Sequence, residues 1–128
     1  MPQDRESGNR ARMWGLRMAQ IVANHLGATL MNPGRSNEAV LENRKVLIKS
    51  THYRVPEIGA TAATLDRIEA VIAALQDKDE LYTIYEVSPN WFQQEMVPSR
   101  NPKTPHVMMV RCSRVREAGK VLGRIKES

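Results

Sequence analysis

The sequence predicts a single α/β domain built on a mixed sheet, and three observations lead to this fold class. A chain of 128 residues fits one domain with one hydrophobic core. Its hydrophobic fraction of 41% and charged fraction of 26% are ordinary for a folded protein. Segments with helical spacing of apolar residues alternate with short runs rich in β-forming residues. We therefore expect residues 9–128 to form the domain, after a flexible N-terminus at residues 1–8.

The first element is expected to be a helix over residues 9–26, which Gly27 would end as a C-terminal cap. The apolar residues that recur there at helical spacing are Trp14, Met18, Ile21, Val22 and Leu26. The basic residues on its outer face are Arg10, Arg12 and Arg17. A short strand at residues 28–31 and a turn at residues 32–34 follow.

The second half of the chain predicts two further helices and two strands around a shorter helical segment. Thr61 is a suitable N-cap for a helix over residues 62–76, which carries an apolar stripe. The remaining expected elements are a strand at 81–87, a short helix at 90–96, an exposed loop at 97–105, a strand at 106–112 and a terminal helix at 115–125. This order predicts an antiparallel hairpin and at least one later strand joined by a helical crossover.

Two short strands at residues 38–42 and 45–50 are predicted to form a hairpin with residues 43–44 as its loop. In that register Glu38 lies directly opposite Lys49, on the same face of the sheet. The other face would be wholly apolar and comprises Ala39, Leu41, Val46 and Ile48. A charge inside a sheet needs a partner or a function, so Glu38 and Lys49 are the candidate site. An ion pair that only stabilises the hairpin is the alternative.

The stretch from Glu38 to Thr51, followed by the predicted helix and the strand at residues 81–87, resembles the restriction-endonuclease-like fold of the PD-(D/E)xK nucleases. In that fold an acidic residue starts the hairpin, and its second strand ends in a carboxylate-x-lysine that serine often follows. The resemblance covers roughly residues 10–112. It implies a Mg²⁺-dependent nuclease acting on DNA, with Glu38 as metal ligand and Lys49 as the catalytic lysine. Carboxylate oxygens suit such a hard cation, and a lysine adds a point charge beside the phosphate.

The motif departs from the family at its second acidic position, which Leu47 occupies here. In some members of the fold the missing acid comes from the crossover helix. Glu69 lies at the edge of the apolar stripe of the helix predicted at residues 62–76, so the resemblance makes it the candidate second Mg²⁺ ligand. Glu57 in the connecting loop is a weaker candidate. His52 follows the motif closely enough to contact a phosphate, although exposed histidines are common.

Positive charge is concentrated towards the C-terminus. Residues 97–128 hold eight Lys and Arg against two Glu, whereas residues 1–96 hold 11 basic residues against 12 acidic ones. A basic end on a near-neutral body suits a polyanion such as nucleic acid. The predicted nucleic-acid-binding residues are Arg111, Arg114, Arg116 and Lys120. A solvated surface that only aids solubility is the alternative.

Several classes of function lack support in the sequence. It contains no Gly-rich phosphate loop, no GxSxG motif and no Cys–His pair. No apolar run approaches the roughly 20 residues of a membrane span, and no signal-peptide-like stretch stands at the start. Cys112 is the only cysteine, which excludes an internal disulfide and favours a reducing, cytoplasmic location.

Three interpretations of function therefore stay open. The first is a metal-dependent nuclease acting on DNA. The second is a non-catalytic nucleic-acid-binding or assembly module that kept the fold and lost the acid at Leu47. The third is a protein-interaction domain whose basic end only aids solubility. A homodimer is compatible with nucleic-acid binding, because a domain this small covers little of a duplex.

Overall fold

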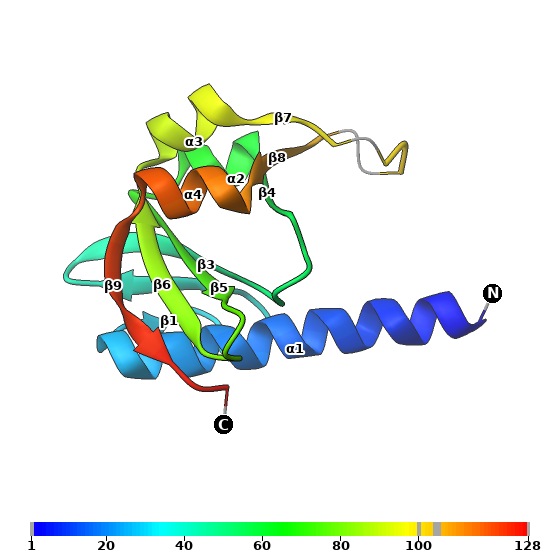
Figure 1. Ribbon diagram of the computed structural model, residues 1–128, viewed down its shortest axis with the longest axis horizontal. Helices are drawn as coiled ribbons and strands as arrows, with labels where there is room; N and C mark the ends of the chain where they lie inside the picture. The colour runs from blue at the N-terminus through cyan, green and yellow to red at the C-terminus, as the bar shows by residue number, and fades with distance from the viewer. Residues whose placement is uncertain (1, 100, 104–105, 128) are drawn as a thin grey trace.

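A long helix, a six-stranded sheet and a layer of short helices and strands make up the protein (Figure 1). The computed structural model describes the backbone of residues 2–99, 101–103 and 106–127, and the side chains within those ranges from Gly8 onward. The elements in chain order are α1 (Pro2–Leu26), β1 (Thr29–Leu30), β2 (Glu38–Leu41), β3 (Arg44–Thr51), β4 (Glu57–Thr61), α2 (Ala62–Asp66), β5 (Ala70–Gln76), β6 (Tyr82–Val87), α3 (Pro89–Glu95), β7 (Val97–Pro98), β8 (Val107–Arg111), α4 (Cys112–Ala118) and β9 (Lys120–Ile125). The predicted single α/β domain with a mixed sheet is confirmed.

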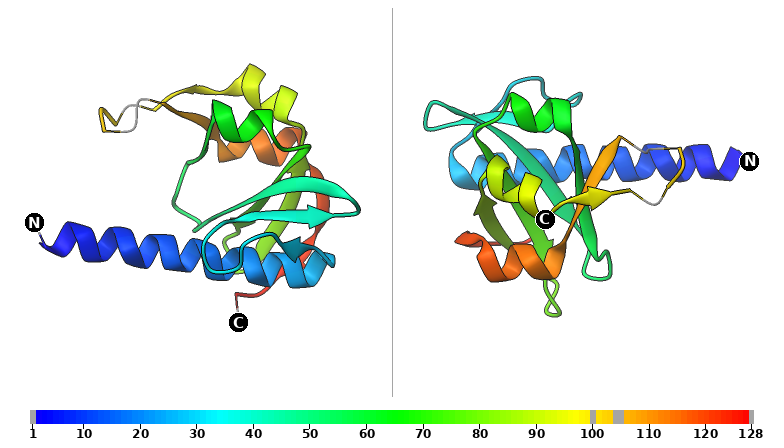
Figure 2. Two further views of the ribbon diagram at one scale, coloured as in Figure 1. Left: turned by 180° about the vertical axis from the view of Figure 1, so that it is seen from behind. Right: turned by 90° about the horizontal axis from the view of Figure 1, so that it is seen from above.

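The six-stranded sheet lies between two layers. Its strand order is β1-β2-β3-β5-β6-β9, in which β3 and β5 run parallel and the other neighbours run antiparallel. Helix α1 covers one face, and α2, α3, α4 and the small sheet β4-β8-β7 cover the other (Figures 1 and 2). Strand β4 and helix α2 form the crossover between β3 and β5. The predicted antiparallel hairpin is therefore confirmed, whereas the crossover contains a strand and one short helix in place of the long helix expected.

Helix α1 packs its C-terminal half onto the sheet. The residues of this half with no exposed surface are Met18, Ala19, Val22 and Ala23. They contact the predicted apolar face of the hairpin, whose residues Ala39, Leu41, Val46 and Ile48 are all buried. Gly27 has a φ of 75°, and the Ala28 N–H donates to the Ala23 carbonyl at 2.8 Å, so the predicted C-cap is confirmed. The helix begins at Pro2 rather than at Asn9, and its N-terminal half extends past the sheet (Figure 1).

The hairpin register differs from the predicted one. Glu42 and Asn43 form the two-residue turn with φ values of 52° and 64°, so Arg44 begins β3. Glu38 consequently lies opposite Leu47 and not opposite Lys49. A two-residue hairpin turn of this type needs positive φ at both central residues, and Asn tolerates that conformation better than Arg. The shift spans two positions, so the predicted composition of each face is retained.

The helix predicted at residues 62–76 is wrong beyond its first turn. Thr61 does cap a helix, since its side chain accepts a hydrogen bond from the Thr64 N–H at 3.1 Å. That helix ends at Asp66, however, and residues 70–76 form the central strand β5. Neighbouring strands and both covering layers bury Ala70 through Leu75 completely or almost so. A strand buried on both faces reads as a continuous apolar run, which periodicity cannot distinguish from a buried helix.

The predicted terminal helix at residues 115–125 is also wrong in part. Helix α4 ends at Ala118, and residues 120–125 form β9, an edge strand paired with β6. Tertiary pairing overrides the weak helical pattern there, because Ile125 lies opposite the fully buried Tyr82. The expected strands at 81–87 and 106–112 and the expected helix at 90–96 are present as β6, β8 and α3. The loop expected at 97–105 begins as β7, and residues 100, 104 and 105 lie outside the described ones. None of the described helices is both long and apolar enough to cross a bilayer.

Candidate nucleic-acid interface

Lys49 occupies a half-buried position on β3, beyond the residues that pair with β2. Burial lowers the pKa of its ammonium group below the ordinary value. No described residue forms a hydrogen bond or an ion pair with the Lys49 amine. A partly desolvated cation without a counter-charge is unfavourable, and an anionic ligand would relieve that cost. Lys49 is therefore a half-buried cation with no counter-charge among the described residues.

Glu38 is engaged by Arg67, for which the sequence carried no signal. Arg67 donates hydrogen bonds to both carboxylate oxygens, from Nε at 3.1 Å and from Nη2 at 2.9 Å. The Arg67 hydrogen bonds lower the pKa of Glu38 and outweigh the opposite effect of burial. The predicted Glu38–Lys49 ion pair is therefore absent, and Arg67 takes the place of Lys49 as the partner of Glu38.

Glu38 and Lys49 nevertheless lie near each other. They share a face of the hairpin at diagonal positions, which are typically about 7–8 Å apart. Both line a cavity of about 300 Å³, whose other walls include Leu47, Gly59 and Arg67. The structure thus brings the two predicted residues to one cavity without direct contact.

Glu69 does not lie on a helix and belongs to a different part of the sheet. It precedes β5, where its N–H donates to the Lys45 carbonyl at 2.7 Å and its carboxylate accepts from the Lys45 N–H at 3.0 Å. Lys45 is four residues before Lys49 on the same strand, a separation of about 13 Å. Leu47, at the family's acidic position, is buried in the core. Among the described residues, no group of three or more His, Cys, Asp and Glu side chains is arranged to hold a metal ion.

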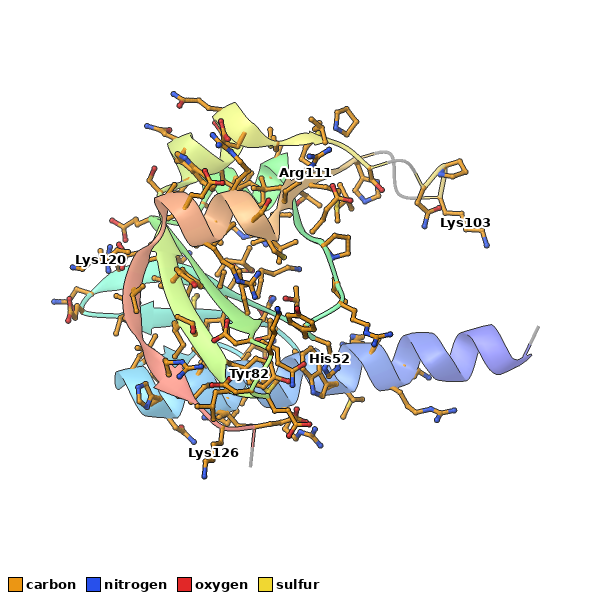
Figure 3. All side chains as sticks on the ribbon, in the orientation of Figure 1. His52, Tyr82, Lys103, Arg111, Lys120 and Lys126 are labelled. Atoms are coloured by element: carbon orange, nitrogen blue, oxygen red, sulfur yellow. The ribbon has the colours of Figure 1, made fainter. Side chains whose placement is uncertain are left out.

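The four basic residues predicted near the C-terminus lie in and around α4, where Arg111 shares one hollow with Arg114 and another with Arg116. Arg114 pairs with Glu95 at 2.7 Å and Glu117 at 3.2 Å. Arg116 donates to the Gln76 carbonyl at 2.8 Å and lies 3.7 Å from a carboxylate oxygen of Asp77. The two members without an ion pair to a described residue flank opposite ends of α4 (Figure 3), and they are Arg111 and Lys120. Ion pairs within the protein therefore offset the charge of two of the four predicted residues.

A cleft of about 700 Å³ instead gathers cations from three separate segments. Arg10 and Arg12 come from the N-terminal half of α1, Arg35 from the loop before β2, and Lys49 with His52 from the end of β3 and beyond. No acidic side chain is among the described residues that line the cleft. Arg35 and Lys49 also line the smaller Glu38 cavity, so the two hollows adjoin. We name this larger hollow the cationic cleft.

The wall of the cationic cleft contains an unsatisfied polar atom. Ser50 Oγ is buried and has no hydrogen-bond partner in the part of the chain that the structure describes. Asn37 closes the hairpin beside it, since Ile48 N–H donates to the Asn37 carbonyl at 2.9 Å and Asn37 Nδ2 donates to the Ile48 carbonyl at 2.7 Å. Because backbone groups alternate along a strand, the N–H and C=O of Ser50 point to the same side of β3 as those of Ile48, which is the side of β2. Ser50 lies past the start of β2, so it has no partner residue on that strand. The hydroxyl of Ser50 is therefore buried behind the wall of the cleft, while its backbone lies at the edge of β3.

An aromatic pair forms another part of the cleft. The rings of Trp14 and His52 stack with centroids 4.0 Å apart and an interplanar angle of 27°. Glu127 fixes the indole by accepting from Trp14 Nε1 at 3.1 Å, and it also accepts from the Tyr82 hydroxyl at 2.9 Å. Burial opposes ionisation of Glu127, but these hydrogen bonds and Arg17 lower the pKa of its carboxyl overall. Figure 3 shows His52 beside α1, at the point where the helix leaves the sheet.

Comparison with known proteins leaves the ligand of this cleft open. No protein family matches the sequence, and no curated protein is significantly similar to it. The function must be argued from the residues of the site.

Sequence reasoning found Lys49 and His52 but did not connect them with the other residues of the cleft. Arg10 and Arg12 were expected only on an exposed helix face, and no pattern in the sequence pointed to Arg35. A signal existed in Trp14, because an aromatic residue flanked by Arg12 and Arg17 is typical of surfaces that bind nucleic acid. Only the packing of α1 against β3 shows that these residues share one cleft.

Proposed function

We propose that this domain binds nucleic acid by its sugar-phosphate backbone in the cationic cleft. The observation that carries the proposal is the convergence of Arg10, Arg12, Arg35 and Lys49 in a hollow with no acidic lining residue among those described. Phosphate groups are the common polyanionic ligand for such a surface, and neutralising them releases condensed counterions. The sequence is basic overall, with a net charge of +5, which favours the same class of partner.

Lys49 supplies the central contact in this proposal. The Lys49 ammonium group is half-buried and has no counter-charge among the described residues. A phosphate oxygen would satisfy it, since an ammonium group offers three donors. The Ser50 side chain points to the opposite face of β3, where its hydroxyl is buried, so it is not part of this contact. Arg12 and Arg35 are exposed and can reach neighbouring phosphates.

The geometry favours the non-catalytic form of nucleic-acid binding. Hydrolysis of a phosphodiester by a Mg²⁺ site needs carboxylate oxygens that are free to bind the ion. The Glu38 carboxylate makes two hydrogen bonds to Arg67, and Leu47 carries no oxygen at the position of the second acid. Glu69 is bound to the backbone of Lys45.

A Mg²⁺-dependent nuclease acting on DNA is the second candidate, and one observation favours it. Glu38 and Lys49 line one cavity, which adjoins the cationic cleft. That arrangement resembles the acid and lysine of the PD-(D/E)xK nucleases. In this candidate Glu38 exchanges Arg67 for a hydrated Mg²⁺ ion, which needs few protein ligands. Lys49 then lies beside the scissile phosphate.

The binding proposal is tested by the salt dependence of affinity for a DNA oligonucleotide. Engagement of Arg12, Arg35 and Lys49 predicts a slope of log K against log salt of about −2. Lys49→Ala should reduce that slope by about 1 and weaken binding. Lys45→Ala removes an exposed lysine of the same strand outside the cleft, and it is the matched control. Absence of binding at low salt, or equal losses in both variants, would reject the proposal.

The second candidate is tested by cleavage. Wild-type protein is incubated with single-stranded and duplex DNA in Mg²⁺ or Mn²⁺, alongside Glu38→Gln and Lys49→Ala. The nuclease interpretation predicts metal-dependent products that both variants abolish. The nuclease interpretation is rejected if cleavage products persist in both variants. It is also rejected if the wild-type protein binds DNA but yields no products, and then only the binding function remains.

A further inference from the structure

We infer that the cationic cleft binds an unpaired nucleotide, whose base stacks on His52 while its phosphate contacts the surrounding cations. This inference rests on the proposed nucleic-acid binding and adds a preference to it. The domain should favour single strands and unpaired ends over an intact duplex.

The stacked pair provides a platform that is fixed on one side and open on the other. Trp14 is half-buried and bonded to Glu127, whereas His52 is exposed. The two rings stack 4.0 Å apart at an interplanar angle of 27°. Because only His52 is exposed, its imidazole is the outer ring of the stack. An exposed planar ring beside cations is the arrangement on which proteins stack the bases of single strands.

Basic side chains line the same cleft as the stacked pair. Arg10 and Arg12 precede Trp14 by four and two residues on α1, a rise of about 6 Å and 3 Å. Lys49 and Ser50 line the same cleft on the strand that leads to His52. The volume of about 700 Å³ is typical of pockets for small ligands and accommodates one nucleotide.

Base pairing would prevent this contact. In a duplex both faces of each base are covered by its neighbours, so a base reaches His52 only after leaving the stack. A single strand has no such requirement. Stacking also tolerates any base, so the inference predicts little sequence preference.

The experiment measures affinity at one salt concentration for three probes of equal length. They are a 12-nucleotide DNA strand, its duplex, and an abasic strand that keeps the sugars and phosphates. The single strand should bind about tenfold more tightly than either of the others, which is the usual size of one base–aromatic stacking contact. In a Trp91→Phe background Trp14 is the remaining tryptophan, and the strand with bases should quench its fluorescence more than the abasic strand.

Variants of His52 separate stacking from charge. His52→Ala should reduce the affinity for the single strand about tenfold and leave the abasic strand within twofold, whereas His52→Phe should restore it. His106→Ala, at another exposed histidine outside the cleft, should have no effect. Equal binding of all three probes, or single-strand binding that is unchanged in His52→Ala, overturns the inference while the proposed function stands. A mononucleotide that binds as tightly as the strand also overturns it, and failure of every polymer to bind rejects the proposed function itself.

Discussion

The indole N–H of Trp14 donates a hydrogen bond to Glu127 at 3.1 Å, joining residues that lie 113 positions apart in the sequence. The same carboxylate accepts from Tyr82 at 2.9 Å and from Arg17 at 2.6 Å. The end of the chain thereby ties α1 to the sheet and fixes one ring of the cationic cleft.

Glu127→Ala should lower the free energy of unfolding by about 1 kcal/mol at pH 7. Trp14, Arg17 and Tyr82 lose their shared acceptor, and solvent reduces the energy of these partly exposed interactions. The folded-state pKa of Glu127 lies below its ordinary value of 4.5. Its contribution is therefore present above that value and is lost as the pH falls through the folded-state pKa. Urea unfolding at pH 7 and at pH 3 measures the difference, which should shrink at pH 3. Glu117→Ala, at a more exposed carboxylate, is the control; an equal effect of both substitutions would contradict the prediction.

Lys49→Met should stabilise the protein while weakening its binding of DNA. Burial lowers the pKa of Lys49 in the folded state, so folding at pH 7 carries the cost of desolvating a charge. That cost fades as the pH rises through the lowered pKa towards the ordinary value of 10.5, so the gain in stability should be largest near pH 7. Unfolding curves across this range measure it, with the exposed Lys45→Met as control. Destabilisation by Lys49→Met at pH 7 would show that the amine has a partner in the folded protein.

Arg67→Ala should raise the pKa of Glu38 towards its ordinary value, because the hydrogen bonds from Arg67 are the largest cause of its lowering. The measurement is a pH titration of the Glu38 carboxyl by NMR. Arg124→Ala breaks contacts with Asp77 and Asp79 instead, and it should leave Glu38 unchanged. A titration of Glu38 that does not move in Arg67→Ala would contradict the observed ion pair.

Ala74→Leu should destabilise the protein by about 1–3 kcal/mol, since a central strand between two packed layers has no room for a larger side chain. Ala74 has no exposed surface and faces the layer of α1. Ala63→Leu, at an exposed position of α2, should change stability by less than about 0.5 kcal/mol. Thermal unfolding compares the two. Similar effects at both positions would favour the amphipathic helix that the sequence pattern indicated over the strand β5.

Elements with a local signal were predictable from the sequence. Gly27 ends α1, and the side chains of Thr61 and Ser88 cap α2 and α3, each through contacts within a few residues. The two faces of the hairpin were also predictable, because alternation depends only on neighbouring residues. The pairing register was not, since the choice between Glu42-Asn43 and Asn43-Arg44 as the turn rests on backbone geometry.

By itself the sequence determined the class of the fold, the first helix and the two faces of the hairpin. The tertiary structure decided the rest. Residues 70–76 form a strand because parallel and antiparallel neighbours flank them, and their alanines allow both layers to pack closely. Arg67 rather than Lys49 engages Glu38, and Lys49 joins Arg12 and Arg35 in one cleft. These relationships depend on which distant segments meet, and no local pattern of residues encodes such meetings.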